Sequence, residues 1–176
     1  MRRVRYSVAT SLDAFIAGPN GEYDWIPSDD AINFPAFFEK IDTVLMGRKT
    51  FEIAVSEDPS AANPSMRTFV FSRTLQPSEF PGVTIVGDNA SSIVSSLRAE
   101  TGKDIWLMGG GELFRCLLDY RLVDTVEIGV VPILLGRGIR LLPEFLKSIP
   151  LKFRKSEAFP SGIILLKYDV EYDRTQ

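Results

Sequence analysis

The sequence predicts an α/β fold built on a largely parallel sheet. Along the first two thirds, short and continuously apolar segments that suit buried strands alternate with segments of helical periodicity. In the last third, two strand-like segments flank a turn at residues 160–162, which predicts an antiparallel hairpin. With 176 residues, 45% of them hydrophobic and 24% charged, the chain fits one globular domain that spans residues 1–176.

The first half of the chain begins with a strand and a long loop. Residues 4–10 alternate in polarity and are rich in β-forming side chains, which predicts a strand. The loop after it is punctuated by glycine and proline at residues 18–21, and ordered loops of this length often carry function. A helix is predicted in the second half of residues 28–41, with Pro35 in its first turn. Residues 43–46 predict a buried strand, and a turn and a helix follow it.

The second half continues the alternation before the chain turns antiparallel. Strands are predicted, in order, at residues 67–72, 83–87, 104–108, 123–131, 151–159 and 163–172. Asn89 is expected to cap the helix that follows the second of these strands, and Gly102 lies just past the end of that helix. A further helix is predicted at residues 112–118, directly after three consecutive glycines.

The composition excludes several classes of chemistry. The chain has no histidine, which excludes Ser-His-Asp triads, Cys-His dyads and His-bearing zinc sites, and no metal site is expected. Its one cysteine, Cys116, lies in an apolar helical pattern typical of a core residue, so no disulfide can form within the chain. A net charge of -3 gives no general attraction for nucleic acid.

The sequence also bears on location. The N-terminal segment carries charges but no long apolar stretch, and no segment approaches the roughly 18 apolar residues of a membrane span. We therefore expect a cytoplasmic protein that binds neither membrane nor nucleic acid. Its expected partner is a small-molecule substrate.

Two predicted strand-to-helix corners, "LMGRKTFE" (45–52) and "LMGGGELF" (107–114), place glycine where a buried strand ends. The N-terminus of a helix presents unpaired N–H groups and a partial positive charge, which together bind phosphate. Arg48 and Lys49 add formal positive charge and Thr50 adds a hydroxyl. The alternative is that Arg48 and Lys49 are an ordinary solvent-exposed pair without a ligand. Neither segment matches a P-loop or the dinucleotide fingerprint G-x-G-x-x-G. The corners therefore predict a pyrophosphate site between them.

The same two segments resemble a known family. "VLMGRKTFE" is similar to the M-G-R-x-T-x-E segment of the dihydrofolate reductase superfamily, and "IWLMGGGELF" is similar to its Gly-Gly segment. The resemblance covers nearly the whole chain and implies a three-layer α/β/α fold around a mixed, mostly parallel sheet of about eight strands. It also implies NADPH as the cofactor, a cis peptide between Gly109 and Gly110, and close approach of the cofactor at Gly111.

Residue by residue, the resemblance implies a cofactor site on both corners and on one further strand end. The implied cofactor-binding residues are Gly47, Arg48, Lys49, Thr50, Ser72, Arg73, Gly109, Gly110, Gly111, Glu112 and Leu113. Arg48, Lys49 and Thr50 would meet the cofactor phosphates, and Ser72 and Arg73 would lie near the adenosine ribose. An arginine there suits a 2′-phosphate, which favours NADPH over NADH.

Two further segments indicate a branch of the superfamily. "TSLDAFIAGPNGEYDW" and "VVPILLGRGIRLL" resemble segments of the reductase domain of bifunctional riboflavin-biosynthesis enzymes, except that Ala14 stands where glycine is usual. The deaminase domain of those enzymes needs a histidine ligand and C-x-x-C, which this chain lacks. The resemblance therefore implies a stand-alone 5-amino-6-(5-phosphoribosylamino)uracil reductase, in which hydride passes from NADPH to C1′ of the ring-opened sugar.

The resemblance also implies substrate-side residues. Asp13 is the implied catalytic and substrate-binding residue, with a loop-capping aspartate as the alternative. Trp25 and Asp29 fall near the positions where folate reductases keep a tryptophan and a pterin-binding carboxylate, with Asp30 as a competitor. Acidic residues here would equally suit the start of a helix. If Asp29 faced a pterin ring, a dihydrofolate or pteridine reductase would be the better assignment.

Three matters stay open at this point. A non-catalytic NADP-binding protein of the same fold would carry the same corners. Arg137 and Arg140 are the obvious basic residues for a substrate phosphate outside the corners. Members of this branch are often homodimers, and residues 126–135 form an apolar antiparallel edge that could supply the interface, although an ordinary core strand would give the same pattern.

Overall fold

The computed structural model describes residues 1–62, 64–144 and 148–172. The strands are β1 (Val4–Ser11), β2 (Phe15–Ala17), β3 (Ile41–Gly47), β4 (Arg67–Phe71), β5 (Thr84–Val86), β6 (Asp104–Gly109), β7 (Thr125–Val131), β8 (Ile139–Arg140), β9 (Leu151–Ala158) and β10 (Ile164–Val170). The helices are α1 (Phe34–Phe38), α2 (Arg48–Glu57), α3 (Ala90–Ala99) and α4 (Gly111–Asp119), with short 3-10 turns η1 (Pro59–Ala62) and η2 (Pro77–Glu79).

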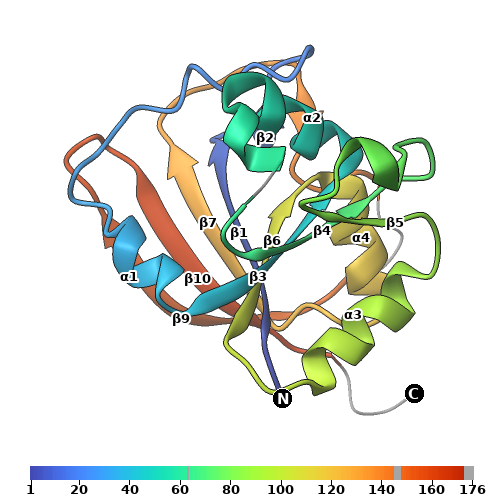
Figure 1. The fold of residues 1–176 in the computed structure, drawn as a ribbon. Coiled ribbons are helices and arrows are strands. Elements are labelled where there is room, and N and C mark those ends of the chain that lie inside the picture. Colours follow the sequence, from blue (N-terminus) through green and yellow to red (C-terminus); the bar gives the residue numbers. More distant parts are fainter. Residues whose placement is uncertain (63, 145–147, 173–176) are drawn as a thin grey trace.

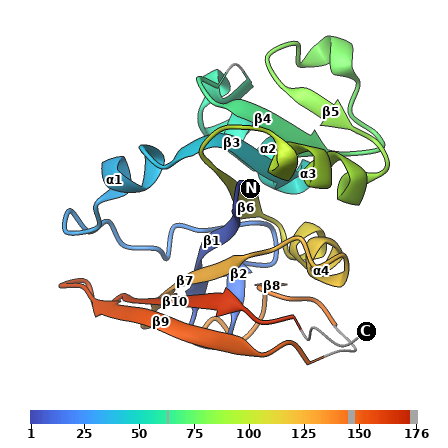
Figure 2. The same cartoon turned by 90° about the horizontal axis from the view of Figure 1, so that it is seen from below.

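An 8-stranded sheet organises the molecule, with the strand order β5-β4-β3-β6-β1-β7-β10-β9 (Figure 1), and β2 and β8 form a separate two-stranded antiparallel sheet. The pairs from β5 to β7 are parallel, whereas β7, β10 and β9 pair antiparallel. Figure 2 shows the resulting twist and the hairpin of β9 and β10 along one side. The predicted α/β class, the mostly parallel sheet and the C-terminal hairpin are confirmed.

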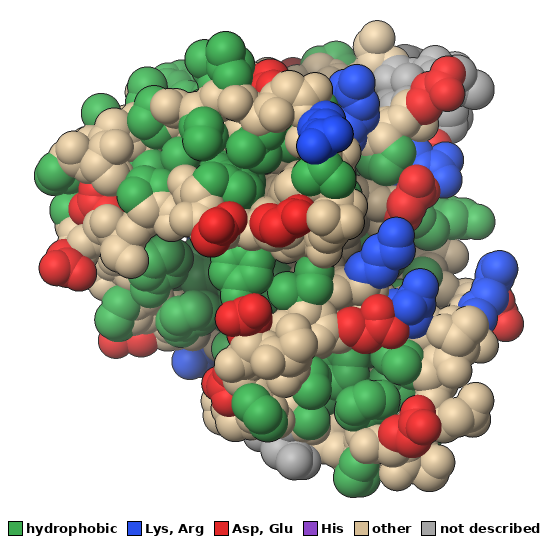
Figure 3. Space-filling model, turned by 90° about the horizontal axis from the view of Figure 1, so that it is seen from above, with side chains coloured by type: hydrophobic (Ala, Val, Ile, Leu, Met, Phe, Trp, Pro, Cys, Tyr) green, Lys and Arg blue, Asp and Glu red, His purple; other side chains and the backbone are tan. Residues whose placement is uncertain are grey.

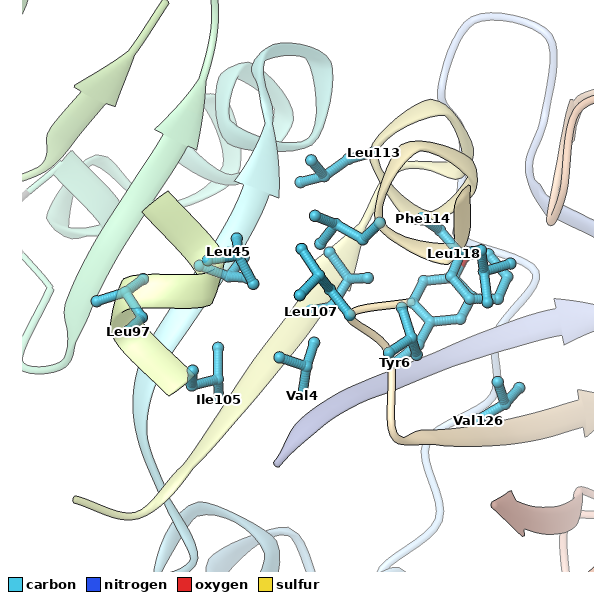
Figure 4. Packing of buried hydrophobic residues seen from close by; sticks show 14 of the residues in the cluster. Val4, Tyr6, Leu45, Leu97, Ile105, Leu107, Leu113, Phe114, Leu118 and Val126 are labelled. Carbon is cyan, nitrogen blue, oxygen red and sulfur yellow. The ribbon is translucent and has the colours of Figure 1, made fainter. Parts of the chain in front are cut away.

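The core is divided between the two faces of the sheet. Alternate residues of a strand point to opposite faces, so Leu45 of β3 packs with the α3 and α4 side, whereas Val44 and Met46 pack with Phe51 of α2. The larger cluster contains a stacked pair of rings, Tyr6 and Phe114, whose centroids lie 3.8 Å apart (Figure 4). The two helix layers are therefore fixed on opposite sides of the same strands.

This arrangement creates a switch point in the sheet. The parallel strands all end at the edge that lies at the top of Figure 1, and the helices after β3 and β6 begin there. β3 and β6 are neighbours, yet α2 packs on one face and α4 on the other. In open α/β sheets, ligands bind outside the carboxyl ends of the strands at such a point.

Local departures from the predicted elements have physical causes. The helix expected within residues 28–41 is only Phe34–Phe38, with Pro35 in its first turn. Asn89 holds the N-cap position of α3, but its left-handed backbone (φ 61°) leaves its side chain without a capping hydrogen bond, so the predicted cap is wrong in this detail. Among the described residues, no helix is long and apolar enough to cross a membrane.

Of the two interpretations of residues 126–135, the structure favours the ordinary core strand. β7 pairs with β1 on one side and with β10 on the other, so it is not an edge of the sheet. The outermost strand on this side is β9, which is exposed along its whole length. Leu151, Phe153 and the adjacent Ile164 are exposed hydrophobic residues there. A homodimer stays a prediction, and β9 offers the free edge.

Candidate functional site

The two glycine corners lie next to each other. Gly47 ends β3 and holds the N-cap position of α2, and Gly110 follows β6 and holds the N-cap position of α4. A Cβ atom built on Gly47 would lie 3.6 Å from the backbone nitrogen of Gly110 and 3.9 Å from the carbonyl oxygen of Gly109. Residues 62 positions apart in sequence therefore meet at the switch point.

Both helices at this point begin without a side-chain cap. Glycine has no side chain that could accept from the first-turn N–H groups, and in the described part of the chain neither helix has a side-chain capping hydrogen bond at its N-cap. Two uncapped helix N-termini from opposite faces of the sheet thus direct N–H donors and partial positive charge toward the same corner. This donor set matches an anionic group such as a diphosphate.

Thr50 lines the glycine turn of the other corner. A Cβ atom on Gly109 would lie 3.3 Å from the Thr50 hydroxyl oxygen, and one on Gly110 would lie 3.6 Å from it. The Gly109–Gly110 peptide bond is cis, which confirms the geometry that the resemblance implied. The Thr50 hydroxyl is therefore in place beside both uncapped N-termini.

Gly111 is enclosed by the chain on the side where a Cβ atom would lie. A Cβ atom on Gly111 would lie 2.8 Å from the carbonyl oxygen of Arg140, 3.1 Å from that of Leu141 and 2.9 Å from Cδ of Pro143. The space beside Gly111 in this direction is occupied by the chain itself, so internal packing requires the third glycine whether or not a cofactor approaches its backbone. Its N–H group remains a first-turn donor of α4.

The charged side chains at the corners are half-exposed and weakly held. Nη1 of Arg48 lies 2.8 Å and 2.9 Å from the two carboxylate oxygens of Glu52, one turn along α2. Exposed pairs of this kind contribute about 0–1 kcal/mol, so Arg48 can turn to a bound anion at little cost. Lys49 is exposed. Glu112 pairs with Arg115 on the surface of α4, whereas the Leu113 side chain is buried, so only the N–H of Leu113 can serve a ligand.

Ser72 and Arg73 both follow β4, but one is buried and the other is exposed. Ser72 is buried, and its hydroxyl accepts hydrogen bonds from the N–H groups of Thr74 (3.1 Å) and Leu75 (3.0 Å). This hydroxyl therefore shapes its own turn. Arg73 is 81% exposed and lies 3.0 Å from Asp88, which itself follows β5.

The surface at this end of the sheet combines apolar and cationic regions. Figure 3 looks down on it and shows hydrophobic side chains gathered around a hollow, with most of the visible Lys and Arg side chains on one side. An apolar surface beside a region that holds most of the visible cations, mixed with acidic side chains, suits a ligand that has both a ring and phosphate groups.

Asp13 holds two loops together. Its carboxylate accepts hydrogen bonds from the Ser11 hydroxyl (2.6 Å) and from the N–H groups of Leu135 (3.1 Å) and Gly136 (2.7 Å). The hydrogen bond from Ser11, supported by those from the two N–H groups, lowers the pKa of Asp13 to about 2. Asp13 is therefore ionised at neutral pH and is not a proton donor there. The observed contacts are those of the loop-capping alternative.

We expect Asp13→Asn to lower the melting temperature at neutral pH, because the new side chain cannot accept all three hydrogen bonds. A group whose pKa is lowered by folding stabilises the fold above its ordinary pKa, here 3.8, and loses this effect as the pH falls toward about 2. Melting curves of the wild type and the variant should therefore differ at neutral pH and converge in acid. A difference that persists unchanged near pH 2 would contradict this account.

Trp25 and Asp29 belong to the loop that joins β2 to α1. The indole N–H of Trp25 donates to the carbonyl oxygen of Glu22 at 3.1 Å. The Asp29 carboxylate accepts from the N–H of Ala31 at 2.9 Å and from that of Ser161, in the turn between β9 and β10, at 2.8 Å. These bonds, led by those with Ser161, lower the pKa of Asp29. Asp29 ties the loop to the hairpin.

The helix-start interpretation of Asp29 is wrong. α1 begins at Phe34, and its capping acceptor is Asn33, whose side-chain oxygen accepts from the N–H of Ala36 at 2.9 Å. The three residues between Asp29 and Asn33 are outside the helix. Of the two arginines considered for a substrate phosphate, the Arg140 guanidinium lies over the Phe15 ring at 5.4 Å from its centroid, and Arg137 is exposed.

Several residues that shape this end of the molecule were not predicted from the sequence. Ser11 both donates to Asp13 and accepts from the N–H of Phe15, and the S-x-D spacing typical of a polar loop turn was the available signal. Ser161 and Asp88 act through partners 132 and 15 positions away, for which local sequence gives no signal.

Comparisons with known proteins agree with this geometry. A family model described as the RibD C-terminal domain matches residues 2–165. The curated protein YyaP of Bacillus subtilis (strain 168), whose function is uncharacterised, is 35% identical over 178 residues, covering 95% of this chain and 94% of that protein. YwjB of the same organism, also uncharacterised, is 28% identical over 167 residues, covering 93% and 96%.

Solved structures show the same architecture. A crystal structure from Shewanella sp. PV-4, whose name assigns it provisionally to riboflavin biosynthesis, has a TM-score of 0.81 and 29% identity, covering 98% of this chain and 100% of its own. A diaminohydroxyphosphoribosylaminopyrimidine deaminase/5-amino-6-(5-phosphoribosylamino)uracil reductase from Thermotoga maritima has a TM-score of 0.72 and 19% identity, covering 97% of this chain and 57% of its own. At that identity the second likeness shows the fold alone.

Proposed function

This chain belongs to the RibD C-terminal domain family, the family of a reductase domain, and on that premise we propose that it is an NADPH-dependent reductase. The activity proposed is most like that of 5-amino-6-(5-phosphoribosylamino)uracil reductase. The observation that carries the proposal is the meeting of two uncapped helix N-termini at the switch point of the sheet.

The residues at the corners suit the diphosphate of a dinucleotide. First-turn N–H groups of α2 and α4 are donors without side-chain acceptors, and the Thr50 hydroxyl lies beside them. Arg48 and Lys49 supply positive charge at the start of α2, and Glu52 competes only through a weak exposed pair. Arg73, two strands away from the β6 corner, is the cation proposed for the ribose 2′-phosphate.

NADPH would supply a hydride to C1′ of the ring-opened imine of the substrate, and the imine nitrogen would take up a proton to give the ribitylamino product. Asp13 is ionised at neutral pH, which argues against it as the source of that proton. Its proposed part is to fix the 11–15 loop against residues 135–136, at the ends of β1 and β7. Asp29 similarly fixes the loop before α1 against the hairpin.

A pterin substrate is less well supported. A pterin-binding site needs a carboxylate that accepts from the ring, and each oxygen of Asp29 already accepts one backbone N–H group of the protein, which reduces the acceptor capacity left for a ligand. The pyrimidine substrate makes no such demand on Asp29. We therefore rank a dihydrofolate or pteridine reductase second.

The test is turnover of NADPH by the purified protein with the ribosylaminopyrimidine phosphate, with dihydrofolate assayed in parallel. A Gly47→Ala variant tests the corner itself. Its methyl group would be in ordinary contact, 3.6 Å from the nitrogen of Gly110, and would occupy the space between the two N-termini. We expect the variant to keep the wild-type melting temperature and to lose about tenfold in turnover at limiting NADPH.

Oxidation of NADPH with the pyrimidine in the wild type, together with the loss in Gly47→Ala, would support the proposal. Turnover with dihydrofolate alone would move the assignment to the second candidate. Binding of NADPH without turnover of either compound would leave a non-catalytic NADP-binding protein, and the proposed reductase would be withdrawn.

A further inference from the structure

A second charged residue faces Arg73 at the end of the neighbouring strand. Nε of Arg73 lies 3.0 Å from a carboxylate oxygen of Asp88, and the two side chains are 81% and 70% exposed. The backbone beneath them is well fixed: the Ser72 N–H donates to the Val86 carbonyl oxygen at 2.9 Å, and the Ser72 hydroxyl holds the following turn. The backbone that carries the pair is therefore held in place, although the two exposed side chains can separate.

This pair lies on the path of a dinucleotide that is bound at the glycine corners. β4 is the neighbour of β3, and β5 is the next strand outward, so the end of β5 is about 10 Å from the end of β3. A ribose attached to a diphosphate at the β3 corner can span that distance. Of the two nucleoside ends, the one directed toward β4 and β5 would meet Arg73 and Asp88 together. This step rests on the proposed function.

The two side chains favour different nucleotides. An arginine donates to a ribose 2′-phosphate, whereas a carboxylate accepts a hydrogen bond from a ribose 2′-hydroxyl and repels a phosphate. Like charges about 5 Å apart still repel each other in water, and a phosphate monoester carries up to two negative charges. Asp88 therefore weakens the binding of a 2′-phosphorylated nucleotide by two routes, through direct repulsion and through competition for Arg73.

We infer that Asp88 is a specificity-determining residue of the cofactor site, which lowers the preference for NADPH over NADH that Arg73 alone would give. The wild-type protein accordingly takes NADPH with only a modest preference, and NADH is a usable second cofactor. Removing the charge of Asp88 sharpens the selection without creating a new contact.

The experiment measures dissociation constants for NADPH and NADH in the wild type, Asp88→Asn and Arg73→Ala, at low and at high salt. Glu157→Gln is the matched control, because Glu157 forms a similar exposed pair with Lys155 on β9, at the opposite edge of the sheet from β5. Asp88→Asn and Glu157→Gln each remove one negative charge, so they change the net charge equally. Their melting temperatures should match that of the wild type, since both acids lie on the surface.

We expect Asp88→Asn to raise the affinity for NADPH about fivefold at low salt, with less gain at high salt, and to leave NADH within about twofold. Glu157→Gln should leave the ratio of the dissociation constants for NADH and NADPH unchanged. This inference is overturned, and the proposed function stands, if the wild type binds NADPH but the ratio of the dissociation constants for NADH and NADPH is the same in Asp88→Asn as in the wild type. An equal change of that ratio in Glu157→Gln would have the same meaning. If no variant binds either nucleotide, both are overturned.

Discussion

Gly111→Ala is expected to lower the free energy of unfolding by about 2–3 kcal/mol. The added methyl group would lie 2.8 Å from the carbonyl oxygen of Arg140 and 3.1 Å from that of Leu141. Both are backbone atoms, which cannot rotate away as a side chain can. Alanine is a better helix former than glycine by up to about 1 kcal/mol, but this gain is smaller than the cost of overpacking a buried site. The sign of the change is therefore destabilising.

Urea unfolding followed by circular dichroism measures this effect, with Gly129→Ala as the control. Gly129 lies in β7, and a Cβ atom there would be in ordinary contact, 3.6 Å from a methyl carbon of Ile163. The control should change the free energy of unfolding by less than about 1 kcal/mol. Equal effects of the two variants would show that Gly111 has room for a side chain, and the packing role assigned to it would be wrong.

Glu127→Gln is expected to cost about 3 kcal/mol of stability, because it removes one partner from a buried ion pair. Glu127 is only 4% exposed, and its carboxylate accepts from Nε (2.7 Å) and Nη2 (3.0 Å) of Arg5. Nζ of Lys167 lies 3.0 Å from the same carboxylate. Lys167 can turn toward solvent, but the Arg5 guanidinium lies over the ring of Phe37 and, among the described residues, would keep only its longer, 3.5 Å contact with Asp104 to balance its buried charge.

The pH dependence of the same variant is a second check. Burial opposes the charged form of Glu127, but the hydrogen bonds and positive charges of Arg5 and Lys167 outweigh it, so the pKa lies below the ordinary value of 4.5. The stabilisation is therefore complete above pH 4.5 and is lost as the pH falls through the folded-state pKa. The difference in stability between wild type and variant should shrink in acid. A difference of less than 1 kcal/mol at neutral pH, the size expected for an exposed pair, would contradict the buried role.

The sequence predicts well those parts of the fold that depend on local pattern. The continuous apolar strands at 43–46 and 104–108 and the glycine turns that follow them are local signals, and the structure joins them at one point of the sheet. The alternation in 123–131 also predicts a strand, but it has the same form in an edge strand and in an interior one. Because pairing partners are set by the whole topology, the interior position of β7 could not be predicted.

The parts of the site that the sequence could not define depend on contacts distant in sequence. Gly111 is limited by the backbone near residue 140, Asp13 by N–H groups at 135–136, and Asp29 by Ser161. In each case the residue type was recognised as unusual, but its partner lies far along the chain. Glu127 shows the same limit, since a glutamate in a strand normally faces solvent and only the packing shows it buried.

The central claim is that the two glycine corners form a dinucleotide site, and direct titration with NADPH tests it most directly. Emission from Trp25 and from Trp106, which lies on β6 just before the glycine turn, reports binding at this end of the molecule. The account predicts saturable quenching by NADPH, weaker binding of NADH, and a loss of about tenfold in NADPH affinity in Arg73→Ala. If neither nucleotide bound at millimolar concentration, the corners would not be a dinucleotide site, and the account would be contradicted.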